Sequence, residues 1–130
     1  MKMLDTNILT AVLRKNPMAV AALDHYRARE QIAISAVSHG EVLFGLAKRP
    51  EATQLRKAAL FLLDTLDILP WDASVSPIYG DLRAKLESKG TPLGSMDMLI
   101  AAHALTLGAA LITADKAFLM VDGLTVENWV

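Results

Sequence analysis

Four acidic residues fall at positions where the predicted secondary structure would bring their carboxylates together. Asp5 follows the short apolar opening at residues 1–4, and Asp115 follows a later apolar run. Glu41 and Asp97 lie near the starts of two predicted helices. Carboxylates that converge in this way repel one another and raise each other's pKa values unless a cation supplies the counter-charge.

The chemistry that this set of side chains favours is metal-ion catalysis. The chain has no cysteine, and its three histidines, His25, His39 and His103, are spaced too irregularly to form a ligand cluster, so we interpret them as structural or surface residues. A set of oxygen ligands suits a hard cation, Mg²⁺ or Mn²⁺. Such an ion activates a water molecule and neutralises charge on a phosphodiester without a catalytic histidine. The four acids together therefore indicate phosphodiester hydrolysis.

Each acid taken alone has a simpler explanation. Asp5 or its neighbour Thr6 could cap a helix, and Asp115 could cap another. Asp97 lies in a first helical turn, where the helix dipole favours acids, and Glu41 could be a solvated helix residue. The functional interpretation depends on all four meeting in the folded chain.

Short strands that alternate with helices are the elements that must position these acids. We expect strands at residues 1–4, 31–35, 67–71, 109–113 and 124–129. We expect helices at residues 6–14, 16–30, 36–49, 51–66, 73–90, 95–108 and 115–120, with those at 36–49 and 51–66 forming an antiparallel hairpin. This alternation predicts an α/β fold: one domain over residues 1–130, with a short, mainly parallel central sheet of four to five strands and helices on both faces.

Segment lengths place the acids at one edge of this sheet. Functional groups of open parallel sheets collect at the carboxyl ends of the strands, where Asp5 and Asp115 lie. The helix that carries Asp97, with Ser95 expected as its cap, leads about 18 Å away from that edge, and the next strand returns about 16 Å. Helical side chains lean toward the helix N-terminus, so Glu41 can reach back toward the same edge.

Composition sets further limits on partners and location. Of the 130 residues, 53% are hydrophobic, which predicts an apolar interface with a second copy or with a partner lying in a groove. The net charge of −1 gives no global attraction to nucleic acid. The apolar stretch at residues 98–114 is shorter than a membrane span, and the opening residues do not form a signal peptide. We therefore expect a cytoplasmic protein without a membrane partner.

Four segments resemble the motifs of a known family. They are "MLDTNIL" at residues 3–9, "ISAVSHGEVLFGL" at 34–46, "GTPLGSMDMLIAAHAL" at 90–105 and "LITADKAFLMVDGLTVENW" at 111–129. In order and combination they are similar to the motifs of PIN-domain ribonucleases, and most closely to VapC toxins of bacterial type II toxin–antitoxin systems. The resemblance covers essentially the whole chain.

The resemblance implies a role for each motif residue. Asp5 and Asp97 match the principal metal ligands, and Glu41 and Asp115 complete the catalytic acidic quartet. Three neighbouring residues match positions that support the ligands or a water molecule through hydrogen bonds: Thr6, Asn7 and Thr113. Met98 departs from the pattern, because close relatives often carry a polar residue after the third acid, and this leaves the contacts around Asp97 open.

The resemblance also implies partners and a cofactor. It implies Mg²⁺ or Mn²⁺, as one or two ions, and an RNA substrate, with tRNA as one possible class. It further implies a homodimer, a VapB-type antitoxin that blocks the site, and a larger toxin–antitoxin complex as a possible assembly. Basic pairs at Lys48–Arg49 and Arg56–Lys57, and Lys116 beside Asp115, are weaker candidates for contacts with RNA phosphates.

Two other function classes compete with a metal-dependent endoribonuclease. A non-catalytic PIN-like module that binds RNA or protein would have no need of four converging acids. A haloacid dehalogenase-type phosphatase needs a second aspartate at position 7, where this chain has Asn7. A receiver domain needs a phosphoacceptor aspartate after its third strand, but the segment "DILPW" at residues 67–71 ends without an acid, and the next one along the chain is Asp72.

Overall fold

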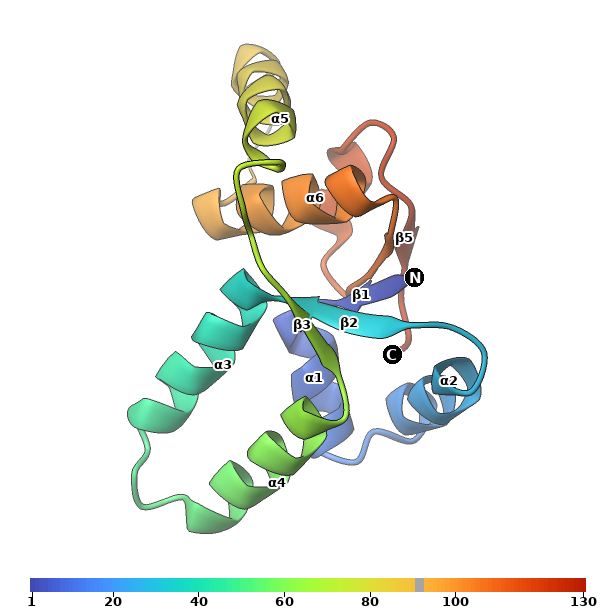
Figure 1. Cartoon of the computed structure of the whole chain (residues 1–130), viewed down its shortest axis with the longest axis vertical. Coiled ribbons are helices and arrows are strands. Elements are labelled where there is room, and N and C mark those ends of the chain that lie inside the picture. The colour runs from blue at the N-terminus through green and yellow to red at the C-terminus, as the bar shows by residue number, and fades with distance from the viewer. Residues whose placement is uncertain (91–92) are drawn as a thin grey trace.

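A parallel sheet between two layers of helices forms the centre of the computed structural model, which describes residues 1–90 and 93–130 (Figure 1). Thr91 and Pro92, two residues of the third quoted motif, lie outside the described residues. The elements in chain order are β1 (Lys2–Leu4), α1 (Thr6–Leu13), α2 (Pro17–Arg27), β2 (Ile32–Ser35), α3 (Ala36–Ala47), α4 (Thr53–Asp64), β3 (Asp67–Leu69), α5 (Ser76–Ser88), α6 (Ser95–Leu107), β4 (Ala110–Ile112), the 3-10 helix η1 (Lys116–Met120) and β5 (Val126–Glu127).

The sheet has the strand order β3-β2-β1-β4-β5, and all four strand pairs are parallel. In the register, Met3 of β1 pairs with Ala33 of β2 on one side and with Leu111 of β4 on the other. This arrangement confirms the predicted α/β fold class with a parallel sheet.

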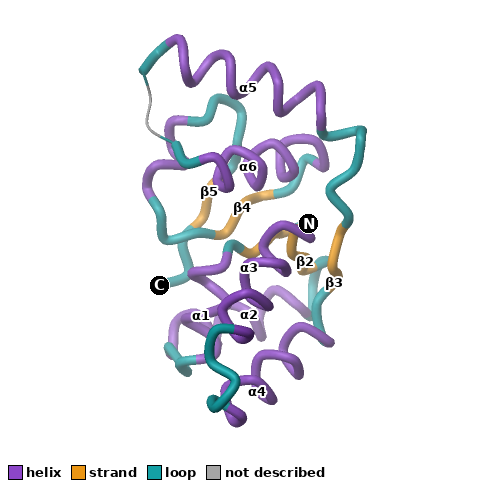
Figure 2. The backbone as a smooth tube through the Cα atoms, turned by 90° about the vertical axis from the view of Figure 1, so that its left-hand side faces the viewer, coloured by secondary structure: helices purple, strands orange, loops and turns teal. Residues whose placement is uncertain are grey.

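Alternation of side chains along the strands divides the interior into two cores. Met3 and Leu111 point into the core that α5 and α6 cover, whereas Leu4 and Ile112, the next residues along, point into the core under α1, α2 and α4. Figure 2 shows the two helical layers above and below the strands. All four side chains are fully buried, as expected for a sheet covered on both faces.

Local sequence signals explain most element boundaries. Asn16 caps α2 by accepting hydrogen bonds from two backbone N–H groups, and Pro17 is the first helical residue, a position that proline favours. The strand predicted at residues 67–71 ends at Leu69, because Pro70 has no N–H to donate to a neighbouring strand. The prediction that Ser95 caps α6 is wrong: Gly94 occupies the N-cap position and Ser95 is the first residue of the helix.

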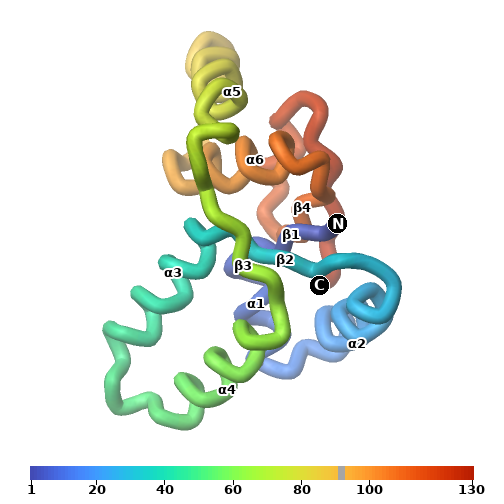
Figure 3. The backbone as a smooth tube through the Cα atoms, in the orientation of Figure 1, coloured from blue at the N-terminus to red at the C-terminus, as the bar shows by residue number. Residues whose placement is uncertain are grey.

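The predicted hairpin of α3 and α4 is open, with α1 contacting both helices. Figures 1 and 3 show α3 and α4 running in nearly opposite directions on either side of the short segment that joins them. Exposed apolar side chains remain on this pair of helices, including Phe44 (64% exposed) and Phe61 (75% exposed). In the described part of the chain, no helix is long and apolar enough to cross a membrane.

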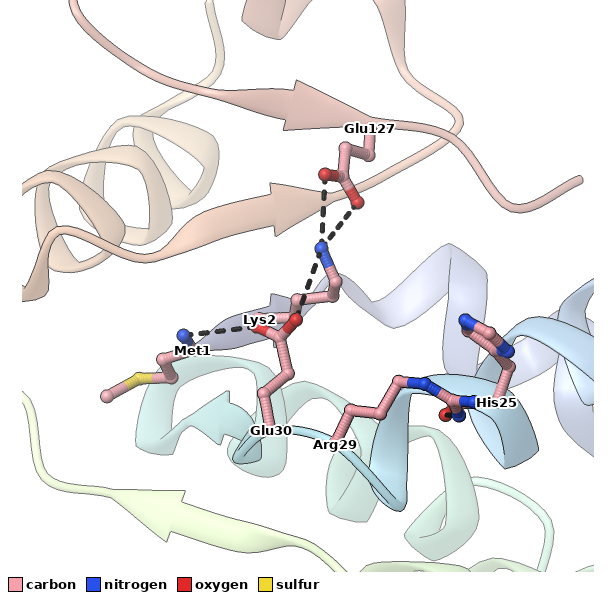
Figure 4. Close-up of polar contacts among 6 residues, drawn as sticks. All are labelled: Met1, Lys2, His25, Arg29, Glu30 and Glu127. Atoms are coloured by element: carbon pink, nitrogen blue, oxygen red, sulfur yellow. Dashed lines mark hydrogen bonds and ion pairs between the residues drawn. The ribbon is translucent and has the colours of Figure 1, made fainter.

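A charged cluster holds the N-terminal strand at the edge opposite the acids (Figure 4). Lys2 is buried, and its Nζ donates to both carboxylate oxygens of Glu127 on β5, at 3.1 and 2.9 Å. The same Nζ lies 3.8 Å from Glu30 and 4.4 Å from the centre of the Tyr26 ring. Burial lowers the pKa of Lys2, but the two glutamates outweigh it, so this pKa is raised. The cluster thus joins β1, β5 and the segment before β2.

We expect the substitution Lys2→Met to lower the free energy of unfolding by about 1–3 kcal/mol, because it removes a buried cation from between two carboxylates. The matched control is Lys89→Met, which breaks the exposed Lys89–Asp122 pair (3.3 Å, side chains 56% and 77% exposed) and should cost less than about 0.5 kcal/mol. Urea unfolding measures both. Equal losses in the two variants would contradict the role assigned to the Lys2 cluster.

His103 is a buried titratable group in α6, with 1% of its surface exposed. Burial lowers its pKa, whereas Asp72 and the carbonyl of Pro70 act in the opposite direction without cancelling the effect. The folded protein therefore keeps His103 neutral at pH values where the unfolded chain, with an ordinary pKa near 6.5, already binds a proton.

This difference predicts a pH-dependent loss of stability. Since the unfolded state binds the extra proton, the free energy of unfolding falls as pH drops below about 6.5, by at most about 1.4 kcal/mol per pH unit from this group. The variant His103→Asn should lose less stability between pH 7 and pH 5.5 than the wild type. Urea unfolding at several pH values measures both slopes, and parallel slopes would show that His103 does not contribute.

Candidate active site

The carboxyl ends of β1 and β4 form the point at which the chain changes its winding direction. From β1 the sheet continues to β2 and β3 on one side, and to β4 and β5 on the other. A crevice opens at such a position in doubly wound sheets and is the usual place for ligands. Asp5 follows β1 directly, and its backbone N–H donates to the carbonyl of Ile112, the last residue of β4 (2.9 Å).

Hydrogen bonds fix both oxygens of the Asp5 carboxylate. Oδ1 accepts from the backbone N–H of Thr6 at 2.8 Å, which makes Asp5 the N-cap of α1. Oδ2 accepts from Thr113 Oγ1 at 2.9 Å and from Asn7 Nδ2 at 3.2 Å. Asp5 is only 6% exposed. The capping interpretation of Asp5 is therefore correct, but it accounts for one oxygen of the two.

Asn7 ties the start of α1 to the turn after β4. Its Nδ2 also donates to Thr113 Oγ1 (3.2 Å), and its Oδ1 accepts from the backbone N–H of Ala114 (3.0 Å). The backbone N–H of Asp115 in turn donates to Thr113 Oγ1 (3.1 Å). Asn7 and Thr113 therefore hold Asp5 and the segment that carries Asp115 in one hydrogen-bonded unit.

Thr6 differs from these two residues. Its backbone N–H is used by Asp5, but its Oγ1 is buried and makes no hydrogen bond within residues 1–90 and 93–130. A buried hydroxyl without a protein partner needs another explanation, such as a water molecule or an ion. This oxygen lies in the residue directly after the most buried acid.

Asp115 lies on the opposite side of this unit and caps η1, since its Oδ1 accepts from the backbone N–H of Ala117 at 2.9 Å. Its charge raises the pKa values of Asp5 and Asp97. As with Asp5, capping uses one carboxylate oxygen, and the charge still acts on the neighbouring acids.

The acids perturb one another in a consistent pattern. Burial is the main cause of the raised pKa of Asp5, which the hydrogen bonds from Thr113, Thr6 and Asn7 oppose and the charge of Asp115 increases. Burial also raises the pKa of Asp97, with further contributions from Asp5 and Asp115.

Glu41 belongs to the same group. Burial raises its pKa first, followed by the charges of Asp5 and Asp97. Asp5 and Asp97 therefore interact with both outer acids, Glu41 and Asp115, and form the middle of the group. The structure brings all four predicted acids within electrostatic range of one another around the β1–β4 crevice.

The four carboxylates do not converge closely enough to share one ion in their present orientations. Within residues 1–90 and 93–130, no three histidine or carboxylate side chains lie close enough together to hold a metal ion in their present orientations. Glu41 and Asp97 make no side-chain hydrogen bond or ion pair with the described residues, so their carboxylates are free to turn. Burial is the main cause of the raised pKa values of Glu41 and Asp97, and repulsion by the other acids adds to it. This repulsion favours separation of the carboxylates without a counter-charge.

The residues present nevertheless fit a hard divalent cation. Four carboxylates supply oxygen donors, Asp5 is held rigidly, and the buried Thr6 Oγ1 adds an oxygen without a protein partner. Mg²⁺ and Mn²⁺ bind such oxygen sets, and Mg²⁺ commonly uses one or two carboxylates together with water and substrate phosphate.

A groove of about 410 Å³ leads away from the acids between α1, α3 and α4. Thr6 and Glu41 line it on the acidic side, and Arg14, Lys48 and Arg49 supply three exposed cations. Its apolar lining consists of Leu9, Leu13, Val42, Gly45, Leu46, Leu55 and Ala59. A smaller hollow of about 210 Å³ begins at Thr113 and Asp115 and includes Lys116 and Asn128. The acids therefore lie between two depressions, one lined by three basic residues and the other by Lys116.

Arg14 is a groove residue that the sequence interpretation missed. It follows the last residue of α1, nine positions after Asp5, so it lies at the far end of the helix that the acid caps. The sequence feature that indicates Arg14 is its pairing with Asp5, since the acid and the base lie at the two ends of one short helix beside the site. Lys48 and Arg49 were weak candidates in the sequence and line the same groove.

Comparison with known proteins agrees with this fold. A family model described as PIN domain matches residues 2–124. Ribonuclease VapC2 of Rickettsia felis is 35% identical over 129 residues, which cover 98% of this chain and 96% of that protein. The tRNA(fMet)-specific endonuclease VapC of Shigella flexneri is 30% identical over 128 residues, which cover 98% and 96% of the two chains.

Solved structures give the same result. A chain in the crystal structure of VapBC2 from Rickettsia felis, bound to a DNA fragment from the promoter, has a TM-score of 0.94 and 33% identity, and the match covers 99% of this chain and 98% of that one. A chain in DNA-bound VapBC from Salmonella typhimurium has a TM-score of 0.90 and 27% identity, with the same coverage. The protein therefore belongs to the PIN-domain family, and its full-length relatives place it with the VapC-type ribonuclease toxins.

Proposed function

We propose that residues 1–130 form a single PIN domain that acts as a metal-dependent endoribonuclease, the toxin of a type II toxin–antitoxin system. The observation that carries this proposal is the Asp5 carboxylate, fixed at the β1–β4 crevice within range of three other carboxylates. Asp5 and Asp97, in the middle of the group, are the proposed principal metal ligands, with Glu41 and Asp115 completing the set.

The chain's own residues hold and orient the reacting groups in this proposal. A Mg²⁺ or Mn²⁺ ion, when bound, supplies counter-charge to the phosphodiester and lowers the pKa of a water molecule. Asn7 and Thr113 keep the Asp5 carboxylate in one orientation, and Thr6 Oγ1 is free to hold a water molecule. The groove cations Arg14, Lys48 and Arg49 neutralise neighbouring phosphates of the RNA.

Incubation of purified protein with total RNA tests the activity directly. We expect cleavage with Mn²⁺ or Mg²⁺ and none after excess EDTA, with activity returning when the metal is restored. The same protein should arrest growth when expressed alone. Persistent lack of cleavage by folded, metal-supplemented protein would favour a non-catalytic RNA- or protein-binding module.

A tRNA is the substrate class to assay first, because relatives from Shigella flexneri and Salmonella typhimurium are tRNA(fMet)-specific endonucleases.

The groove between α1, α3 and α4 is the proposed seat of a VapB-type antitoxin. It has an apolar lining and exposed cations, which suits an amphipathic segment that carries acidic residues, and it reaches Glu41. Solved relatives are VapBC complexes bound to DNA, so a larger toxin–antitoxin assembly on DNA is proposed here as well. Occupation of the groove would exclude RNA from the acids.

The substitution Leu55→Glu tests the antitoxin groove. Leu55 is 39% exposed and lines the groove, so a charge there should weaken antitoxin binding by about tenfold or more. Met18→Glu is the matched control, since Met18 is an exposed residue of α2 (66%) outside the groove lining. Calorimetry with the product of the adjacent antitoxin-sized reading frame measures affinity. Unchanged binding by Leu55→Glu would place the antitoxin elsewhere.

We also propose a homodimer and a cytoplasmic location. Exposed apolar side chains on α3, α4 and η1, among them Phe44, Phe61 and Leu119, provide surface for association with a second copy. The location follows from the proposed RNA substrate. Sedimentation at several protein concentrations tests the dimer, and a monomer at all concentrations would contradict it.

A further inference from the structure

A buried hydrogen bond joins two helices that carry proposed metal ligands. His103 Nδ1 of α6 lies 2.8 Å from Ser35 Oγ, at the boundary between β2 and α3. His103 is 1% exposed and Ser35 is fully buried. α3 carries Glu41 and α6 carries Asp97, and the two helices pack against each other. This contact therefore connects Glu41 and Asp97 through the protein interior.

Ser35 is also the residue that begins α3. Its Oγ accepts a hydrogen bond from the backbone N–H of Val37 (3.1 Å), which makes it the N-cap of the helix. An N-cap fixes the direction in which the chain enters the first turn. A partner that holds the Ser35 side chain thus also holds the start of α3, and Glu41 lies six residues further along that helix.

The contact uses the Ser35 hydroxyl twice. Its Oγ accepts from the backbone N–H of Val37 and forms a second hydrogen bond with His103 Nδ1, whose direction depends on the tautomer of the ring. The carbonyl of Pro70 also acts on the ring, since it raises the pKa of His103 against the larger effect of burial.

The pair is placed so that it can control the separation of the acids. Asp97 lies six residues before His103 on α6, about 9 Å along the helix axis. Pro70 follows β3 directly, so His103 contacts the carboxyl-end side of β2 and the loop after β3 together. A change at this contact shifts the start of α3 relative to α6 and moves Glu41 relative to Asp97.

A serine and a histidine in contact, with Asp72 close enough to affect the ring, could suggest a nucleophilic triad. Burial excludes this interpretation, because no substrate reaches a serine oxygen that is fully enclosed. Ser35 is also engaged as a helix cap. The pair acts on the acids through the helices and has no contact with substrate.

We propose that His103 and Ser35 are positioning residues, which set the separation of Glu41 and Asp97 and thereby the affinity of the acidic site for its divalent cation. This inference rests on the proposed function, since it concerns the same site. Residues that orient metal ligands from outside the coordination sphere typically contribute about 10–100-fold to metal affinity. A contact that acts through two helices should fall at the lower end of that range.

Two substitutions of His103 distinguish the contribution of Nδ1 from that of Nε2. In His103→Asn, the side-chain amide occupies approximately the place of Nδ1 and offers either an acceptor or a donor to Ser35. In His103→Gln, the amide occupies approximately the place of Nε2 and the contact with Ser35 is lost. Leu86→Ala is the matched control for stability, because it creates a cavity in the α5–α6 core without changing a hydrogen bond.

The measurements are Mn²⁺ affinity by calorimetry, the melting temperature, and kcat and KM for RNA cleavage. We expect His103→Gln to bind Mn²⁺ about tenfold more weakly and to lose kcat with little change in KM at limiting Mn²⁺, with excess Mn²⁺ restoring kcat. His103→Asn should retain Mn²⁺ affinity within about threefold. Leu86→Ala should lower the melting temperature with unchanged Mn²⁺ affinity.

Two outcomes would overturn the inference. One is folded His103→Gln with wild-type Mn²⁺ affinity, and the other is a loss of affinity in Leu86→Ala of the same size as in His103→Gln, which would reflect stability alone. Failure of the proposed function is distinguishable, because it would appear in the wild type as absence of both Mn²⁺ binding and RNA cleavage.

Discussion

The substitution Asp5→Asn is expected to lower RNA cleavage by about a thousandfold, or about 4 kcal/mol in activation free energy. Asp5 is the most constrained acid of the site, with both oxygens hydrogen-bonded and little exposed surface. An amide has the same shape but lacks the charge that binds a cation. Its NH₂ group would also face the donors Asn7 Nδ2 and Thr113 Oγ1, or else replace the oxygen that caps α1.

The measurement is the rate of cleavage of a tRNA substrate under saturating Mn²⁺, with circular dichroism as a test of folding. Asp122→Asn is the matched control, because Asp122 is an exposed aspartate, with a side chain that is 77% exposed, paired to Lys89 on the surface. It should cleave at the wild-type rate. Full cleavage by folded Asp5→Asn would remove the basis for the proposed active site.

Short-range signals in the sequence predicted the fold well. Strand and helix succession, the caps at Asp5 and Asn16, and the stop of α6 at Gly108 all depend on neighbouring residues. Gly108 has a φ of 64°, a left-handed conformation that glycine adopts without strain, so the end of that helix is encoded locally. The carboxyl-end placement of Asp5 and Asp115 follows from the same reasoning about parallel strands.

Features that depend on side chains far apart in the chain could not be predicted in this way. His103 contacts Ser35 over 68 positions, and nothing in the residues around either one indicates the other. The irregular spacing of the histidines indicates a structural or surface role for His103, and only the packing of α3 against α6 links it to the helices that carry Glu41 and Asp97. The groove between α1, α3 and α4 likewise depends on α1 lying against two helices that are distant from it in the sequence.

The site combines one acid held by hydrogen bonds with two acids that have no such bonds to the described residues. Hydrogen bonds hold Asp5, whereas Glu41 and Asp97 make no such contacts with the described residues and have pKa values raised by burial and by neighbouring charges. Such an arrangement is less stable without a cation than a site of neutral residues would be. A bound cation reverses this effect, so folding stability and metal binding are linked.

The linkage predicts a large effect of Mn²⁺ on the wild type. At a free concentration of 100 times Kd, one ion adds about 2.7 kcal/mol to the free energy of unfolding, which should raise the melting temperature of a domain of this size by about 10 °C. EDTA should remove the whole increase. Thermal melts over a series of Mn²⁺ concentrations measure the effect, and a melting temperature independent of Mn²⁺ would contradict a metal site among these acids.

Asp97→Asn separates metal binding from general stability, because it should change the two in opposite directions. Without metal, the variant lacks one of the repelling carboxylates. The substitution also removes no hydrogen bond to the described residues, because the Asp97 side chain makes none. The melting temperature of the variant without metal should therefore equal or slightly exceed that of the wild type. With Mn²⁺, the variant should gain almost nothing, and RNA cleavage should fall by about a hundredfold or more. A variant that is destabilised without metal yet still gains about 10 °C with Mn²⁺ would show that Asp97 supports the fold and does not hold the ion.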